Sequence, residues 1–229
     1  MGYQPYMRDL PDTDYAALQN ANLEHGVSKA LKRLTDIVIA GFALLFLLPI
    51  MVLIAVMVRL SDGGPVLFRH KRVGRDGEEF QCMKFRSMNP DAEAQLPNLL
   101  SDNPVALAEW RANQKIENDP RVTKFGKFLR KSSLDELPQL FNILRGEMSI
   151  VGPRPIVRDE IEKYGEFYAF YCQVRPGMTG LWQVSGRSDT SYQERVDLDV
   201  KYVSEWSFLK DLKIMAMTIP AVLFSDGAK

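Results

Sequence analysis

Two adjacent acids, Asp135 and Glu136, lie among basic residues and are the strongest candidates for chemistry in this 229-residue sequence. Arg130 precedes them, and Arg154 follows between two prolines, which restrict the backbone of a long cation. Guanidinium groups grip phosphate oxygens with paired hydrogen bonds, and neighbouring carboxylates can bind a divalent metal or attack phosphorus. The combination is typical of a phosphate-handling site.

The same acids also fit a simple helix start. Ser133 and Glu136 have the spacing of a capping box, and acids are favoured at the positive end of a helix dipole. Pro138 stands where a helix begun at Ser133 would already need its amide, so the start would be irregular. On these residues alone both interpretations stay open.

Further candidate phosphate-binding cations are Lys84 and Arg86, which flank Phe85 in "KFRSM", and Arg175 in the turn-rich "RPGMTGLWQVSGR". Alternating cations on a strand are usually a solvated face. The "DPR" of residues 119–121 has the composition of an ordinary turn.

Composition and motif content argue against several classes of protein. Lys and Arg together number 29, as do Asp and Glu, so the totals do not suggest a nucleic-acid-binding protein. Cys82 and Cys172 have no CxxC spacing, and neither His25 nor His70 has a histidine partner nearby in the sequence. A zinc site, a disulfide framework and a histidine-based relay are therefore not indicated.

The pattern of apolar and turn residues predicts an α+β fold, mostly helical, with a β-hairpin centred on residues 74–77. A capping box at Ser191 and Glu194 predicts another helix start. The final apolar segment carries lysines on one face and is expected to lie at a membrane interface. The remaining expectations are helices at 104–117, 122–132, 138–146 and 157–173, an extended segment at 149–155, and a loop at 175–187.

An uncharged run from Ile37 to Val58 predicts a membrane anchor. As a helix it would be about 33 Å long, enough to cross a hydrocarbon core of ~30 Å. Basic residues lie on both sides of the run, and cytoplasmic flanks carry such an excess. A hairpin bent at Pro49 would leave both flanks in the cytoplasm, whereas a spanning helix with a modest kink is the alternative.

This interpretation divides the chain into three parts. Residues 1–28 are expected to form a flexible arm, residues 29–60 a re-entrant membrane hairpin, and residues 61–229 a catalytic domain on the cytoplasmic face.

With these residues assembled, the sequence from about Lys29 onward resembles the bacterial sugar transferases, monotopic polyprenyl-phosphate phosphoglycosyl transferases. The resemblance rests on "KRLTDIVIA", "KFRSM", "DPRVTKFGKFLRKSSLDELPQLFNILRGEMSIVGPRP" and "RPGMTGLWQVSGR", in the family's order. The "SDGGPVLF" and "TIPAV" segments are most similar to those of short enzymes that start exopolysaccharide repeat units.

The resemblance implies roles for individual residues. Asp135 matches a nucleophile that attacks the sugar-bearing phosphate of a UDP-sugar, forming a phosphosugar–enzyme intermediate and releasing UMP. Glu136 matches its partner, which helps bind Mg²⁺ or activates the acceptor, undecaprenyl phosphate. Lys84, Arg130 and Arg154 match cations that hold phosphate groups.

The resemblance also implies a re-entrant helix bent at a proline, a location on the cytoplasmic face of the bacterial inner membrane, contact with membrane lipid, and a possible homodimer. Leu48 stands before Pro49 where some members carry serine, so the hydrogen bonding of the bend is not defined by the resemblance. No residue identifies the sugar.

Two alternatives belong to other mechanisms. In one, the chain is a membrane-tethered scaffold whose basic segments bind anionic lipid or a partner, and the acids only cap a helix. In the other, the acceptor phosphate attacks the UDP-sugar directly, without a covalent intermediate.

Overall fold

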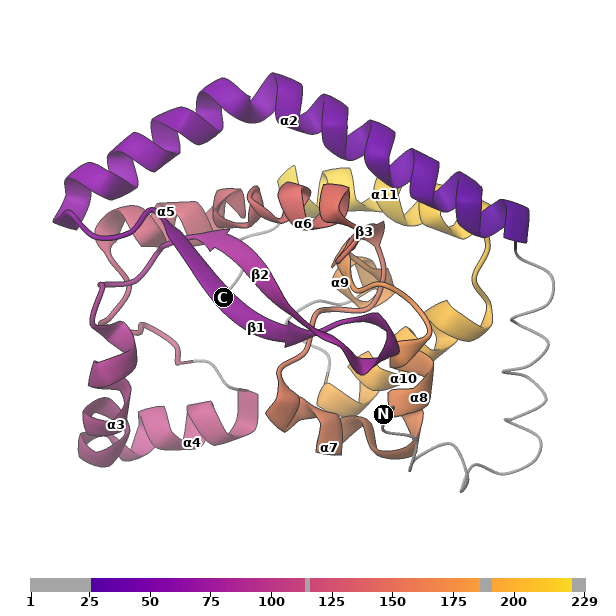
Figure 1. The fold of residues 1–229 in the computed structure, drawn as a ribbon. Coiled ribbons are helices and arrows are strands. Elements are labelled where there is room, and N and C mark those ends of the chain that lie inside the picture. Colours follow the sequence, from indigo (N-terminus) through magenta and orange to yellow (C-terminus); the bar gives the residue numbers. More distant parts are fainter. Residues whose placement is uncertain (1–25, 114–115, 186–190, 224–229) are drawn as a thin grey trace. The chain divides into compact units, whose positions relative to one another are not determined.

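A computed structural model describes residues 26–113, 116–185 and 191–223. The predicted arm at 1–28 lies almost wholly outside the described residues. Within them the chain is mostly helical and contains two small two-stranded sheets, which confirms the α+β class (Figure 1). The elements, in chain order, are α2 (Gly26–Asp62), β1 (Leu67–Val73), η1 (Arg75–Gly77), β2 (Glu79–Phe85), α3 (Ala92–Asp102), α4 (Pro104–Asn113), α5 (Lys124–Lys131), η2 (Leu134–Glu136), α6 (Gln139–Arg145), β3 (Ser149–Val151), η3 (Arg158–Glu160), α7 (Ile161–Tyr164), η4 (Gly165–Phe167), α8 (Tyr168–Cys172), β4 (Gly177–Thr179), α9 (Leu181–Ser185), α10 (Tyr192–Ser204) and α11 (Phe208–Leu223).

Several local predictions are confirmed. Strands β1 and β2 pair as the expected hairpin, and Gly77 has the positive φ of +75° that the connection requires. Helix α6 ends before Gly146, whose φ is +82°. Helix α10 begins with the capping box: the Ser191 amide donates to Oε2 of Glu194 at 2.7 Å, and the Glu194 amide donates to Oγ of Ser191 at 3.2 Å.

Two predictions from local pattern are wrong. The helix expected at 157–173 is a series of short helical pieces, η3 to α8, interrupted at Gly165, whose φ of +52° and ψ of −130° do not fit a helix. The loop expected at 175–187 contains β4 and α9. Strand β4 pairs in parallel with β3, Ser149 opposite Gly177, and the backbones pack so closely that a Cβ on Gly177 would lie 2.1 Å from the Gly152 nitrogen.

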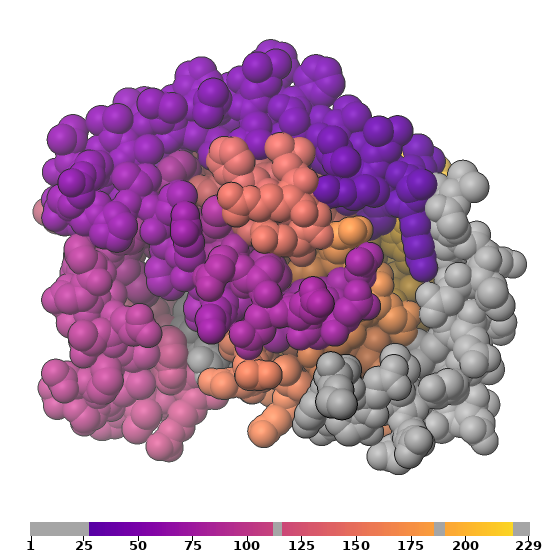
Figure 2. All heavy atoms as spheres, in the orientation of Figure 1, coloured from indigo at the N-terminus to yellow at the C-terminus, as the bar shows by residue number. Residues whose placement is uncertain are grey.

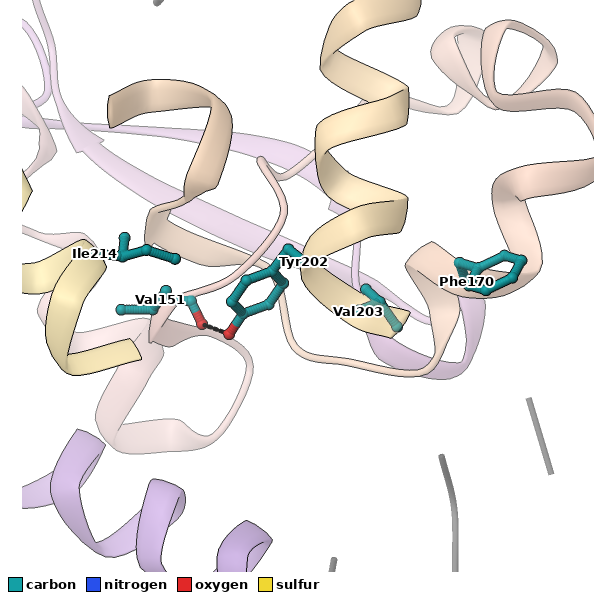
Figure 3. Close-up of a cluster of buried hydrophobic side chains, with 5 residues drawn as sticks. All are labelled: Val151, Phe170, Tyr202, Val203 and Ile214. Atoms are coloured by element: carbon teal, nitrogen blue, oxygen red, sulfur yellow. Dashed lines mark hydrogen bonds between the residues drawn. The ribbon is translucent and has the colours of Figure 1, made fainter. Parts of the chain in front are cut away.

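The described chain divides into two compact units. The first comprises residues 26–46, 69–83 and 139–223, and the second comprises residues 47–68 and 84–138. A buried cluster in the first unit joins β3, α8, α10 and α11 through Val151, Phe170, Tyr202, Val203 and Ile214 (Figure 3). The Tyr202 hydroxyl donates to the Val151 carbonyl at 3.1 Å, so the polar end of this buried ring is satisfied.

The N-terminal arm of α2 is fixed within the first unit by polar contacts. Lys32 Nζ donates to Oδ2 of Asp211 on α11 at 2.6 Å and to the Val151 carbonyl at 2.9 Å. Arg33 donates to the carbonyls of Ile143 and Leu144, near the end of α6, at 2.6 and 3.0 Å. A cation at that position complements the negative end of the α6 dipole. Two of the basic residues that flank the apolar run therefore also have internal partners.

Helix α2 is long and apolar enough to cross a membrane, and it is the one such helix among the described residues. Its apolar side chains stand at the surface along the helix, indigo to purple at the top of the view (Figure 2). Phe46, for example, is 72% exposed. Exposed apolar surface of this extent is typical of sites that contact a membrane or another protein. Helix α2 continues through Pro49, so the proline does not end the helix. The re-entrant path remains a prediction.

Candidate active site

The acidic pair lies on a short 3-10 turn, η2, and not at the start of an α-helix. Ser133 has a left-handed conformation, with φ +56°, and its side chain makes no capping hydrogen bond. Its amide donates instead to the Arg130 carbonyl at 3.2 Å. Helix α6 begins only at Gln139, after Pro138. The capping-box interpretation of Ser133 and Glu136 is therefore wrong, and the irregular start expected from Pro138 is confirmed.

The two carboxylates of the pair have different surroundings. Asp135 is buried, with 8% of its surface exposed. Glu136 is more accessible and forms an ion pair with Lys84, whose Nζ lies 2.5 Å from Oε1 of Glu136. Both partners of that ion pair have side chains that are 33% exposed. The second unit thus brings together buried Asp135 and partly exposed Lys84 and Glu136, three of the predicted site residues.

The charge of Asp135 is controlled by burial and by its neighbours. Burial raises the pKa of Asp135 to about 6. The positive charges of Lys84 and Arg130 lower that pKa, and the negative charge of Glu136 raises it. At pH 7 most Asp135 carboxylates remain ionised, although they are poorly hydrated. A charged and weakly solvated carboxylate is the form that a nucleophile needs.

Arg130 reaches this pair because α5 packs tightly on the segment that follows β2. The side chain of Thr123 caps α5 by accepting from the Gly126 amide at 2.9 Å. A Cβ on Gly126 would lie 1.9 Å from the carbonyl oxygen of Ser87, so only glycine permits this approach. The Ser87 hydroxyl in turn accepts a hydrogen bond from Nε of Arg130 at 2.9 Å. Ser87 therefore holds the arginine by its Nε edge.

Arg86 has a different environment from the other predicted phosphate-binding cations. It is buried and forms an ion pair with Asp62 at the end of α2. Gly64 leaves the space that the guanidinium occupies, since a Cβ there would overlap with Nη1 of Arg86. The side chain connects the end of α2 to the segment after β2. Its predicted contact with phosphate remains a prediction.

Arg154 and Arg175 belong to the first unit. Arg154 lines a pocket that also contains Tyr192 and Asp199. Nε of Arg175 donates at 2.6 Å to the carbonyl of Gly146, the residue that follows α6. The predicted contacts of both arginines with phosphate remain predictions.

The turn predicted at the "DPR" motif is confirmed, and the structure adds that its charged side chains are buried. Asp119 and Arg121 form a buried ion pair, with Nη2 and Oδ2 2.6 Å apart. The Arg121 amide also donates to Oδ1 of Asp119 at 3.0 Å, which is the bond of an Asx turn. An aspartate two residues before an arginine is a local signal for such a turn. The burial of this ion pair, however, depends on α3: Nη1 of Arg121 donates to the carbonyl of Ala92, the first residue of that helix, at 3.1 Å.

The acidic pair suits a divalent cation that is shared with a phosphate ligand. Among the described residues no three acidic, histidine or cysteine side chains come together, so an all-protein cage is not found there. Mg²⁺ is commonly bound by one or two carboxylates, with waters and substrate phosphates completing its shell. Adjacent Asp135 and Glu136 meet that requirement, and Lys84 already balances part of their charge.

Comparisons with known proteins agree with this chemistry. A family model described as bacterial sugar transferase matches residues 27–225. The exopolysaccharide production protein ExoY of Rhizobium meliloti is 52% identical over 197 residues, which cover 86% of this chain and 87% of that protein.

Two longer relatives carry names that describe a reaction. The undecaprenyl-phosphate galactose phosphotransferase of Salmonella typhimurium is 49% identical over 211 residues, 92% of this chain and 44% of that protein. The UDP-glucose:undecaprenyl-phosphate glucose-1-phosphate transferase of Escherichia coli is 42% identical over 202 residues, 85% of this chain and 40% of that protein. Because the family match takes in most of the chain, this protein belongs to the bacterial sugar transferase family.

Proposed function

We propose that this protein is a phosphoglycosyl transferase that moves a sugar 1-phosphate from a UDP-sugar to undecaprenyl phosphate, starting an exopolysaccharide repeat unit. Membership of the sugar transferase family and the reactions named for the relatives support this assignment. The single structural observation that carries it is a buried carboxylate, Asp135, placed in the field of Lys84 and Arg130.

In the first step, an Asp135 carboxylate oxygen forms a bond to the phosphorus that carries the sugar. The bond from that phosphorus to the bridging oxygen breaks, and UMP leaves with the oxygen. Repulsion between a carboxylate and a diphosphate opposes this approach, so nearby cations are required. Lys84 and Arg130 supply positive charge near Asp135.

In the second step, a phosphate oxygen of the lipid acceptor attacks the same phosphorus. The bond to Asp135 breaks, which restores the free carboxylate and yields a lipid diphosphosugar. We assign Glu136 to this step, either as a base that takes a proton from the acceptor phosphate or as a ligand to the metal. The ion pair with Lys84 fixes the direction of the Glu136 carboxylate, which either role needs.

Mg²⁺ is the proposed cofactor, held by Asp135, Glu136 and the donor's phosphate oxygens. When bound, it would screen the negative charge of the diphosphate.

The remaining proposals concern location. We place the enzyme on the cytoplasmic face of the inner membrane, with α2 as a re-entrant anchor in contact with lipid and α11 at the interface. Exposed Leu209 and Ile219 on α11, together with the apolar surface of α2, support contact with lipid. A homodimer is also consistent with the family.

The decisive experiment supplies donor without acceptor. The purified protein is incubated with a panel of UDP-sugars and Mg²⁺, and UMP release and the mass of the peptide that contains Asp135 are measured. We expect about one UMP per chain and a mass increase of one sugar phosphate on that peptide. Asp135→Asn should give neither. Asp159→Asn, which alters an exposed aspartate on another 3-10 turn, is the matched control.

The alternatives give other results. Direct transfer predicts no UMP until undecaprenyl phosphate is added, and then turnover without a modified peptide. A scaffold without catalysis predicts no UMP under either condition, and equal behaviour of Asp135→Asn and the wild type.

A further inference from the structure

The Arg86 side chain attaches the end of α2 to the segment after β2. Its Nη2 donates to Oδ1 of Asp62, the last residue of α2, and its backbone amide donates to the Val66 carbonyl at 2.9 Å. The Gly64 amide also donates to Oδ1 of Asp62, at 3.1 Å. The side chain and the backbone of Arg86 are therefore both bonded to the chain that leaves α2, and all of these residues belong to the second unit.

The guanidinium of Arg86 is enclosed. The Arg86 side chain is 6% exposed, and that of Asp62 is 21% exposed. A Cβ on Gly64 would overlap with Nη1 of Arg86 and lie 2.9 Å from Cγ of Pro90, so the loop after α2 lies directly against the charge. Nη1 has no hydrogen-bond partner among the described residues, so the Asp62 carboxylate is the main compensation there for burying this cation. A phosphate group would have to displace the loop to reach it.

Asp62 stands at a position that is unfavourable for an acid within the helix itself. The C-terminal end of a helix carries partial negative charge, which favours cations and disfavours a carboxylate. Arg59 follows this preference, since it donates to the carbonyls of Gly63 and Gly64, the latter at 3.1 Å. The acid is explained instead by its partners beyond the helix, above all the guanidinium of Arg86.

Arg86 is only two residues from Lys84, the lysine of the candidate site. Lys84 Nζ lies 2.5 Å from Oε1 of Glu136, and Phe85, between the two cations, is 4% exposed. A strand rises about 3.3 Å per residue, so the Cα atoms of Lys84 and Arg86 are about 7 Å apart. The closely packed residue between them leaves little freedom for one to move without the other. A shift of Arg86 is therefore passed on to the Lys84 ammonium.

We propose that Arg86 is a positioning residue. Bonded to Asp62, it fixes the segment that carries Lys84 and so keeps the Lys84 ammonium beside Glu136 and near Asp135. The proposal rests on the proposed function, in which Lys84 is one of the cations that allow a carboxylate to approach the diphosphate. It is an alternative to the phosphate contact that the sequence predicts for Arg86. The same ion pair joins the site lysine to the helix that we propose as the anchor.

Asp62→Asn distinguishes the two roles, because it removes the anion and leaves Arg86 itself unchanged. If Arg86 is a positioning residue, UMP release at saturating donor should slow about tenfold, as for loss of a hydrogen bond between charged groups, with little change in the KM for donor. If Arg86 contacts phosphate, Asp62→Asn frees it, so the rate should not fall and the KM for donor should stay the same or decrease.

Two further variants complete this comparison on the full chain in detergent. Asp62→Glu keeps the negative charge and should restore most of the rate that Asp62→Asn loses. Asp102→Asn is the matched control, because Asp102 is an exposed aspartate that also ends a helix, α3, and its replacement should change neither the rate nor the KM.

A second measurement reports the position of Lys84 without relying on activity. The protein is acylated with acetic anhydride well below the melting temperature of each variant, and mass spectrometry compares labelling of Lys84 with that of Lys127, an exposed lysine on α5. The ion pair with Glu136 should protect the Lys84 amine in the wild type. We expect Asp62→Asn to raise the ratio of Lys84 to Lys127 labelling several-fold, whereas general loosening of the unit would raise labelling of both lysines.

Unchanged UMP release in Asp62→Asn overturns the proposal, and so does slower release with an unchanged labelling ratio. A wild type that releases no UMP with any donor overturns the proposed function instead. In that case the labelling ratio still decides whether the ion pair between Asp62 and Arg86 holds Lys84 in place.

Discussion

The Asp135 carboxylate is buried, so its ionisation affects the stability of the fold as well as its reactivity. Its pKa in the folded chain is about 6, against an ordinary value of 3.8. A carboxyl group whose pKa is raised by folding binds its proton more tightly in the folded state. The ionised form therefore destabilises the fold, increasingly as pH rises from about 4 to 6 and fully above that range.

Asp135→Asn should therefore make the protein inactive and more stable. At pH 7, without metal, we expect the free energy of unfolding to rise by up to about 3 kcal/mol, because a neutral amide avoids the cost of burying a charge. At pH 4 the difference should nearly vanish. Melting temperatures in EDTA at both pH values check this. A variant less stable than the wild type at pH 7 would show that the neighbouring cations outweigh burial.

Ser87 is expected to position Arg130, although it touches no reacting atom. Ser87→Ala should slow UMP release about tenfold, since a hydrogen bond to a charged group is lost and the guanidinium is no longer held by its Nε. In an Arg130→Gln background the same change should have almost no effect. A serine with only a structural role would slow both backgrounds equally. Ser132→Ala, whose hydroxyl bonds to a backbone carbonyl of α5, is the control.

At the scale of elements, the close packing of α5 on the segment after β2 determines where Arg130 lies. Gly126→Ala places a methyl group where the Ser87 carbonyl now stands, so the helix must move. We expect a loss of about 1 to 3 kcal/mol of stability and a larger proportional loss of activity. Lys127→Ala, on the exposed side of the same helix, should change neither. Unfolding curves and UMP release measured together distinguish displacement of the helix from general unfolding.

The contact between α2 and α11 depends on a buried ion pair. Lys32→Met leaves the Asp211 carboxylate buried without its cation, and we expect a loss of about 3 to 5 kcal/mol. Adding Asp211→Asn should recover much of that loss, because the amide oxygen can still accept from Nε1 of Trp206 while the amide NH₂ donates to the Tyr202 hydroxyl. Lys213→Met, an exposed lysine on α11, is the control. If the double variant were no better than Lys32→Met, the lysine would act through packing and not through charge.

The elements with local signals were predictable from sequence, and those that depend on distant partners were not. The hairpin, α5, α6 and α10 each have turn or cap residues within a few positions of their ends. Strand β4 is only three residues long and exists because β3 supplies its hydrogen bonds from 28 residues earlier, Ser149 opposite Gly177. The capping box predicted at Ser133 does not form, although its residue types and spacing match the motif. The Glu136 carboxylate bonds instead to Lys84, which is 52 residues away in the sequence.

The same limit applies to the candidate site. Residue types identified Asp135, Glu136, Lys84 and Arg130 as candidates, and the structure brings these four together in the second unit. The contact of Ser87 with Arg130 was not predicted, because a serine after a strand indicates no particular role until its hydrogen-bond partner is known.

At the scale of the whole molecule, the proposed path of α2 leads to a test of topology. Tags at residues 1 and 229 should both be accessible from the cytoplasm if the anchor is re-entrant. Replacing Pro49 by Leu restores a backbone hydrogen bond to α2, so part of the population should span the membrane and expose one tag to the other side. Pro97→Ala, in α3, should leave both tags in place. Wild-type tags on opposite faces would show that α2 spans.

The ion pair between Lys32 and Asp211 also determines when the protein can finish folding. The two residues are 179 positions apart. At about 5 to 20 residues per second of synthesis, Lys32 waits roughly 9 to 36 s for its partner, with the apolar helix beside it already made. The first unit needs α11 to close around that lysine, so it must be completed late in synthesis. The helix that we propose as the anchor is therefore complete before the first unit can finish folding.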